Sequence, residues 1–318
     1  MERNLQIKHS LLLLFASIIW GTAFVAQSAG GDVTGPYTFN CIRSFIGAAA
    51  LLPVIIWRDR TGTSKRPVSK EDKKNLLLGG VLCGAVLCFV TNMQQLGLYY
   101  GTTAGKGGFL TACYILLVPI LGLFLKKKCS FNIWIGVAFA LVGLYLLCMN
   151  ESFALQYSDI LMMLCAFAFA VHILLVEYFS PKVGSVRLCA LQFFVTGVIS
   201  ILLMVFVEMK PFAGGFAGWS ASLTTSAAWI PLLYAGVLSS GVAYTLQIIG
   251  QRGLNPTVAS LMMSPESAFS ALGGWIILHE VLSARELSGC LFIFIAILLA
   301  QLPAEWFRLT RKKQTLDY

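Results

Sequence analysis

Charged residues are scarce in this chain of 318 residues, at 12% of the sequence against about a quarter in soluble domains. That scarcity excludes an ordinary soluble protein. Histidine is also rare, with three residues, and the nine cysteines contain no Cys-x-x-Cys pair. These absences argue against a metal site and a disulfide framework, so the cysteines are expected to be small buried apolar residues. We expect no metal and no cofactor.

What the chain has instead is apolar sequence, since 58% of its residues are hydrophobic. Runs of about 20 apolar residues, the length that crosses a bilayer, follow one another with short gaps. The sequence predicts ten spans, at 9–28, 36–57, 76–99, 105–125, 131–149, 158–179, 186–207, 227–250, 256–278 and 287–305. Ten spans leave no room for a soluble catalytic domain.

The net charge of +9 does not predict a nucleic-acid partner, because the basic residues are distributed by loop. Alternate loops carry 19 of the 23 Lys and Arg residues, with the largest group in 58–75 and another in the tail 306–318. The other set of loops carries only Lys210 and Arg285. This positive-inside pattern predicts a protein of the cytoplasmic membrane with both termini, including the basic tail 306–318, in the cytoplasm.

The first span has an alternative interpretation as a secretory signal peptide. Arg3 and Lys8 precede the apolar run Leu11–Leu14, and Ala26-Gln27-Ser28 is similar to a cleavage site. Removal of this span would leave nine spans and unbalance the two halves of the chain. We therefore expect the span to be retained.

The chain repeats itself loosely between residues 92–136 and 245–289. An offset of about 153 residues converts one series of matched positions into the other. The pairs are Gln94 and Gln247, Gly97 and Gly250, Ala112 and Pro265, Lys127 and Glu280, and Gly136 and Gly289. Each half, 9–149 and 158–305, then holds five spans, and an odd number inserts the second half upside down. The sequence predicts an all-α membrane protein built as two inverted five-helix repeats, an arrangement typical of transporters.

Several motifs resemble the EamA-type permeases of the drug/metabolite transporter superfamily, and together they cover most of the chain. The motifs are Trp20-Gly21-Thr22-Ala23-Phe24, Arg43 with the small residues Gly47–Ala50, Asn92–Tyr100, Thr102–Lys106, Phe109-Leu110-Thr111, Ser264-Pro265-Glu266 and His279-Glu280. Lys127 departs from the pattern, since it stands where such proteins often have Glu. The resemblance implies a secondary transporter of a small metabolite or drug-like solute, working by alternating access and exporting its solute.

Three charged residues lie within or at the edge of predicted spans, where a charge costs at least ~2.5–3.5 kcal/mol. Glu266, near the middle of its span beside Pro265, is either a proton-coupling carboxylate or a structural partner of a cation. Arg43, roughly 10 Å deep at about 1.5 Å per residue, either binds an anionic group of the solute or pairs with Glu266. Lys106 either extends to the interface or reaches a cavity.

Uncharged polar and aromatic residues complete the candidate solute cavity. Amides in apolar helices either bond neighbouring helices, for roughly 0.6 kcal/mol each, or line a cavity, and their recurrence at matched positions favours the cavity. Flat aromatic side chains either form its walls or simply pack. The candidates are Trp20, Asn92, Gln94, Gln95, Thr111, Tyr114, Gln192, Tyr244, Gln247 and Ser264. His172, a lone histidine, is expected to bond a backbone carbonyl, with a proton relay as the alternative.

The sequence favours a carrier over other membrane functions. There is no GxxxxGK[ST] loop, so transport is expected to be driven by a gradient, with proton coupling as one possibility and uncoupled exchange or uptake as the other. We find no catalytic constellation for an intramembrane enzyme. The polar residues scatter over many spans, unlike the single polar stripe of a lipid scramblase. The expected partners are a small solute and the bilayer, and the expected state is a monomer or weak homodimer.

Overall fold

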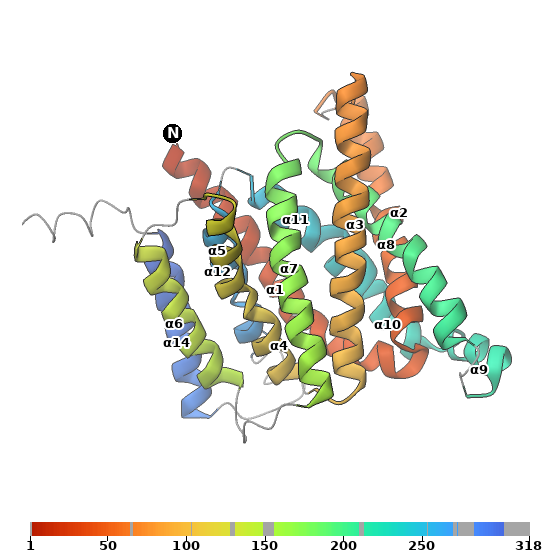
Figure 1. The fold of residues 1–318 in the computed structure, drawn as a ribbon. Coiled ribbons are helices and arrows are strands. Elements are labelled where there is room, and N and C mark those ends of the chain that lie inside the picture. The colour runs from red at the N-terminus through yellow and green to blue at the C-terminus, as the bar shows by residue number, and fades with distance from the viewer. Residues whose placement is uncertain are drawn as a thin grey trace, which may run out of the picture.

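The protein is a bundle of helices packed side by side (Figure 1). The structure is a computed structural model that describes residues 2–63, 66–102, 104–127, 131–148, 156–209, 213–252, 254–269, 272 and 283–301. These residues contain helices and short turns and no strand. The all-α class predicted from the sequence is therefore confirmed for the described part of the chain.

The helices follow the apolar runs of the sequence, with differences at their ends. The first six are α1 (Glu2–Thr34), α2 (Pro36–Arg60), α3 (Lys70–Tyr99), α4 (Ala104–Ala112), α5 (Tyr114–Phe124) and α6 (Phe131–Cys148). Next come α7 (Tyr157–Phe179), α8 (Ser185–Leu203), α9 (Gly215–Ser222), α10 (Ser226–Leu233), α11 (Tyr244–Gly250), α12 (Pro256–Met263) and α14 (Ala284–Gln301). Two π-helical segments, η1 (Met204–Glu208) and η2 (Tyr234–Ala243), continue α8 and join α10 to α11.

Local sequence explains where helices start. Ser69 accepts a hydrogen bond from the Asp72 backbone N–H at 2.9 Å, and Asp72 accepts one from the Ser69 N–H, which caps α3 reciprocally. Gly35 turns the chain from α1 into α2 with a φ of 87°, which favours glycine, and Pro36 then begins the helix. These caps fix the register in which α2 and α3 enter the bundle.

Two predicted spans are interrupted near their middles. The span 105–125 breaks at Cys113 into α4 and α5, and the span 256–278 breaks after Met263. At the second break Pro265 has no N–H for the Leu261 carbonyl, which accepts instead from the Ser264 N–H at 3.2 Å and hydroxyl at 2.7 Å. Interrupted helices are tolerated at membrane depth only where protein or a cavity surrounds them.

The expectation of ten spans is met only in part by the described residues. Six helices are long and apolar enough to cross a membrane, namely Leu5–Thr34, Pro36–Arg60, Lys70–Tyr99, Tyr157–Phe179, Ser185–Glu208 and Ser226–Gly250. Three predicted spans appear as shorter apolar helices, Leu110–Phe124, Ile133–Leu146 and Leu287–Ala296. Part of the ninth, within 256–278, lies outside the described residues. The count of ten and the inverted repeat remain predictions.

Helix packing joins the two halves of the chain along their whole length. Helix α3 packs against α7, α2 against α8, and α1 against α10, η2 and α11. Helices α6 and α14 stand together at one edge of the bundle, away from α2 and α8 (Figure 1). Glycines permit the closest approaches: a Cβ at Gly47 would lie 2.7 Å from the Ser240 Cβ. Most contacts that hold the bundle together are therefore made between the two halves.

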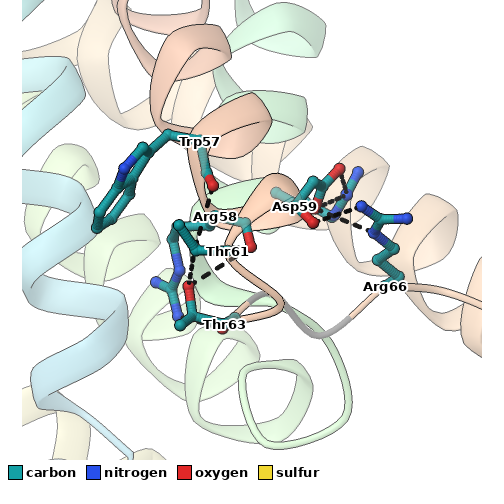
Figure 2. Close-up of polar contacts among 7 residues, drawn as sticks. Trp57, Arg58, Asp59, Thr61, Thr63 and Arg66 are labelled. Carbon is teal, nitrogen blue, oxygen red and sulfur yellow. Dashed lines mark hydrogen bonds and ion pairs between the residues drawn. The ribbon is translucent and has the colours of Figure 1, made fainter.

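One end of α2 is tied to α8 by an ion pair. Arg187, near the start of α8, donates to both carboxylate oxygens of Asp59 at 2.6 Å. Arg66 approaches Asp59 at 3.5 Å from the loop after α2 (Figure 2). The same end of the bundle carries the Lys127–Glu177 pair, at 2.5 Å, between the chain after α5 and α7. We call this end the basic face. The sequence assigns its loops to the cytoplasm.

The other end of α2 is tied to η1, the continuation of α8, by a buried carboxylate. Glu208, at the end of η1, accepts hydrogen bonds from the Tyr37 N–H at 2.8 Å, the Thr38 N–H at 2.9 Å and the Thr38 hydroxyl. Trp219 of α9 donates from Nε1 to the Thr38 hydroxyl oxygen at 2.8 Å. A carboxylate at the first turn of α2 also complements the helix dipole. Helices α2 and α8 are thus held together at both faces and form a rigid frame.

The arrangement predicts the labelling of two engineered cysteines. Thr63→Cys, in the exposed loop after α2, should be modified by a membrane-impermeant thiol reagent only from the cytoplasm, because its loop carries the basic excess. Thr224→Cys, in the exposed turn before α10, should be modified only from outside. The wild-type chain corrects for the native cysteines. Labelling with the two sides exchanged would contradict the assigned orientation.

The two ties between α2 and α8 should differ in strength. Glu208→Gln should lower the thermal unfolding temperature in detergent more than Asp59→Asn. Glu208 is buried, and the new amide NH₂ faces backbone donors, for which a loss of roughly 1–3 kcal/mol is expected. Asp59 and Arg187 are partly exposed, so their pair is worth about 1 kcal/mol or less. An Asp59→Asn variant that is the less stable of the two would contradict this order.

Candidate functional site

The structure contains a cavity among eight helical segments, with about 420 Å³ of empty space when the open solvent at its mouth is included. Most of its lining residues lie in the half of their helices away from the basic face. Gln27, for example, is near the end of α1 at Thr34, and Arg43 is near the start of α2 at Pro36. The cavity is lined by Trp20, Phe24, Gln27, Arg43, Val90, Gln94, Thr111, Phe169, Ser239, Tyr244 and Glu266.

Arg43 is buried at the cavity, with 4% of its surface exposed. Its Nη1 donates to Gln27 Oε1 at 3.0 Å, and its guanidinium carbon lies 5.7 Å from the centre of the Phe39 ring. Gln95 donates from Nε2 to the Gln27 carbonyl at 2.7 Å, which fixes Gln27 from the other side. Within the described residues, Arg43 Nε has no hydrogen-bond partner. The guanidinium is therefore held in place by Gln27, while its Nε–H donor has no partner in this part of the structure.

Glu266 follows the break in the ninth predicted span and is also buried, with 4% of its surface exposed. Its Oε1 has no hydrogen-bond partner among the described residues, and none of their ion pairs joins it to Arg43. The alternative in which Arg43 and Glu266 form an internal salt bridge is thus not what the described residues show. A buried carboxylate and a buried guanidinium share one cavity without neutralising each other.

Aromatic rings form the floor of the cavity on the side of the basic face. The ring centres of Trp20 and Tyr244 are 4.8 Å apart, and that of Phe169 is 6.1 Å from Trp20. Tyr114 continues the layer, with its ring centre 5.0 Å from Phe169. Edge-on ring packing of this kind makes a continuous apolar layer. Three of these rings, Trp20, Phe169 and Tyr244, line the cavity.

Six of the thirteen sequence-predicted site residues line the cavity. They are Trp20, Arg43, Gln94, Thr111, Tyr244 and Glu266. Six others lie outside the lining: Asn92, Gln95, Tyr114, Gln192, Gln247 and Ser264. The side chain of Lys106 is outside the described part of the structure, as are Glu280 and the tail 306–318.

The residues outside the lining have identifiable structural contacts in most cases. Asn92 accepts from Asn40 Nδ2 at 3.1 Å and so joins α2 to α3. Gln192 bonds His172 Nε2 at 3.2 Å between α8 and α7, so the expected backbone partner of His172 is wrong. Ser264 closes the break before Pro265, as described above. Asn92 and Gln192 thus connect helices, which is the alternative that the sequence left open, whereas Ser264 bonds within its own span.

Five cavity residues were not singled out from the sequence as part of the site: Phe24, Gln27, Val90, Phe169 and Ser239. Gln27 lies seven residues after Trp20 on α1, two helical turns along the same face, so helical periodicity predicts it. Phe169 stands in α7 among other apolar residues and gives no such signal. Ser239 is carried into the cavity by η2, and a π-helical segment is not encoded by a simple pattern.

The arrangement suits reversible binding rather than bond chemistry. The described residues contain no cluster of three His, Cys, Asp or Glu side chains that could hold a metal ion. What the cavity offers is one cation, one carboxylate, amide and hydroxyl groups, and flat aromatic walls, the mixture typical of a small-molecule site.

Comparison with known proteins gives a consistent result over nearly the whole chain. The sequence model described as "EamA-like transporter family" matches residues 7–149 and 156–302. The chain is 26% identical over 296 residues to an uncharacterized transporter of Archaeoglobus fulgidus, covering 91% of this chain and 84% of the relative. It is 23% identical over 297 residues to the uncharacterized transporter YoaV of Bacillus subtilis, covering 92% of this chain and 96% of the relative.

A solved structure, titled only as the crystal structure of a protein, has the same fold. It superposes with a TM-score of 0.75 at 17% identity, over 94% of this chain and 98% of the other. The two family matches together span both halves of the chain, and the apolar helices cross the bilayer several times. The chain belongs to the EamA-like transporter family and is a multi-pass membrane transporter of small solutes.

Proposed function

We propose that this transporter is a secondary active carrier that exports a small metabolite or drug-like solute across the cytoplasmic membrane. It works by alternating access, and Glu266 couples solute movement to proton movement. The outward direction is inferred from the resemblance to EamA-type permeases. The remaining parts of the proposal rest on the cavity.

The single observation that carries the proposal is the unneutralised pair of charges in the cavity. Arg43 and Glu266 are each 4% exposed, and among the described residues they do not pair with each other. A buried charge that is neither paired nor fully hydrogen-bonded is costly, so a structural role accounts poorly for either residue. A role in binding a solute or a proton accounts for both.

The interrupted helices support a carrier with a central site. The breaks at Cys113 and at Ser264–Pro265 lie near the cavity residues Thr111 and Glu266. In secondary transporters, discontinuous helices place polar groups at the membrane midplane, where access alternates between the two sides. Glu266 follows such a break directly, so a small change of helix direction there changes its surroundings.

The lining defines the chemistry of the solute. A guanidinium with unused donor capacity favours a solute that carries a carboxylate or phosphate group. The walls formed by Trp20, Phe24 and Phe169 favour an apolar or aromatic portion. We therefore propose a small amphipathic solute with an anionic group.

Counterflow in proteoliposomes tests the proposed function. The purified protein should exchange an internal unlabelled solute for an external labelled one when a library of small metabolites is screened. Empty liposomes provide the control for leakage. Inside-out and right-side-out vesicles then establish the direction of net movement. Absence of exchange for every anionic amphipathic solute of suitable size would contradict the proposal.

Glu266→Gln should abolish transport driven by a pH gradient and largely spare solute-for-solute exchange. Glutamine keeps the size and polarity of a protonated glutamate but does not release a proton. Both rates are measured in the same proteoliposomes. The matched control is Gln94→Asn, which shortens another polar side chain of the lining by one methylene group. Wild-type rates of gradient-driven transport in Glu266→Gln would assign the carboxylate a structural role and favour uncoupled exchange or uptake.

Arg43 should determine binding of the anionic group. Arg43→Lys keeps the charge but loses the two-pronged geometry, and Arg43→Gln loses both. The half-saturating solute concentration should therefore rise from wild type to Lys and further to Gln, with an increase of roughly tenfold or more for Gln if a charge-assisted bond of about 1.5–3 kcal/mol is lost. An unchanged half-saturating concentration in Arg43→Gln would exclude this role.

A further inference from the structure

A stripe of buried polar side chains runs along α11 from the cavity toward the basic face. Tyr244, Gln247 and Gln251 are spaced three and four residues apart, which places them on one side of the helix. Tyr244 lines the cavity, and Arg252 at the basic face follows Gln251 directly. The stripe therefore extends from the floor of the cavity to the end of the bundle.

The two amide side chains of this stripe are buried and form no hydrogen bond with the described residues. Gln247 is 0% exposed and Gln251 is 2% exposed. Neither the oxygen nor the nitrogen of either amide has a hydrogen-bond partner in the described part of the chain. Buried amides are almost always hydrogen-bonded, so two neighbours with four unsatisfied atoms need an explanation. Because the two amides are aligned with the solute cavity, they are expected to gain hydrogen-bond partners in another conformation of the protein.

Helix α1 covers the far end of this stripe at Gly250. A Cβ at Gly250 would lie 2.8 Å from the Leu13 side chain and 3.0 Å from the His9 carbonyl oxygen. The His9 ring nitrogen Nδ1 lies 3.2 Å from the Gly250 carbonyl oxygen, within hydrogen-bond distance. Helices α1 and α11 are therefore in direct contact at the basic face, and a glycine permits the contact.

The contacts that tie α2 to α8 are stronger than the contact between α1 and α11 at Gly250. Helices α2 and α8 are tied at the basic face by Asp59 and Arg187 and at the other face by Glu208 and Thr38. Both ties are present together, so this pair does not separate at either face in the observed state. The α1–α11 contact, with one hydrogen bond and one leucine against a glycine, is the weaker closure.

We infer that the route between the cavity and the basic face runs along the α11 stripe, and that the α1–α11 contact at Gly250 is its gate. This inference rests on the proposed function. When the gate opens, Gln247 and Gln251 bond water or the polar groups of the solute. When it closes, the aromatic layer of Trp20 and Tyr244 and the contact of Leu13 with Gly250 seal the route.

Thiol labelling in proteoliposomes tests the route without a known solute. Gln251→Cys should react with a membrane-impermeant methanethiosulfonate reagent added on the side of the basic face. Ile249→Cys, on the opposite side of α11 and only half-buried, is the matched control and should stay at the level of the wild-type chain, whose native cysteines set the background. Equal reaction of the two variants, or reaction of Gln251→Cys only from the other side, would overturn the inference.

Two further variants test the gate in the Gln251→Cys background. Gly250→Ala adds a methyl group that forces α1 and α11 apart, and Leu13→Ala removes the side chain that covers Gly250. Each should raise the labelling rate of Gln251→Cys severalfold. Leu13→Ala adds no bulk, so it keeps the test valid if Gly250→Ala fails to fold. Unchanged labelling in a folded Leu13→Ala variant would exclude a gate at this contact.

The transport assay separates this inference from the proposed function. Replacement of Gln247 and Gln251 together by Leu should lower the counterflow rate severalfold, with Ile249→Leu as the control. If wild-type counterflow proceeds and the double variant matches it, the route is wrong although the protein is a carrier. If the wild type moves no solute but Gln251→Cys is labelled as expected, the carrier function fails and the hydrated route stands.

Discussion

Polar groups inside a bilayer have no bulk water to bond, and this constraint governs the structure at every level. It makes the described chain helical, because helices satisfy their own backbone. Where Pro265 interrupts a helix, the Ser264 N–H and hydroxyl both bond the carbonyl that proline leaves free. The same requirement explains why several buried polar side chains, such as Asn40, Gln95 and Gln192, bond a neighbouring helix.

The buried polar residues separate into two groups by whether they have partners. Asn92, His172, Gln192 and Glu208 bond side chains or backbone of other helices and hold the bundle together. Arg43, Glu266, Gln247 and Gln251 keep unsatisfied atoms within the described structure. The first group stabilises one arrangement of helices. The second group lies at the cavity or on the stripe along α11, and the proposed function assigns water or a solute as the missing partner.

The positions of the paired and unpaired polar residues explain both the fixed packing of α2 on α8 and the location of the cavity. Helices α2 and α8 carry their ties at their ends, with Asp59 and Glu208 each accepting donors from the start of the other helix. Arg43 lies between these ties, nearer the start of α2, and lines the cavity. Helices α1 and α11 meet at Gly250 through the Leu13 side chain and one hydrogen bond of His9. A carrier needs both properties, a fixed frame and contacts that separate at low cost.

The relatives from Archaeoglobus fulgidus and Bacillus subtilis are described only as transporters. The cavity is therefore the main guide to the chemistry of the solute that this protein binds. A site with one cation, one carboxylate and aromatic walls would select solutes by their charge and their shape together. Either charge alone in a dry cavity would be hard to maintain. Arg43 keeps one polar contact, with Gln27, whereas Glu266 Oε1 has no partner among the described residues.

The sequence by itself determined the class of protein and part of the site. Scarce charge and long apolar runs predict a helical membrane protein, and Pro265 predicts a broken helix, because these are local or compositional properties. Arg43 and Glu266 were identifiable because charge within an apolar run is costly wherever the run packs. Only the tertiary structure decided which amides line the cavity. Gln94 and Gln95 are neighbours in sequence, yet Gln94 faces the cavity and Gln95 bonds the Gln27 carbonyl, because one residue turns a helix by about 100°. The pairing of Asp59 with Arg187, and of Glu208 with Thr38, likewise joins residues distant in sequence, and only the packing of α2 against α8 brings them together.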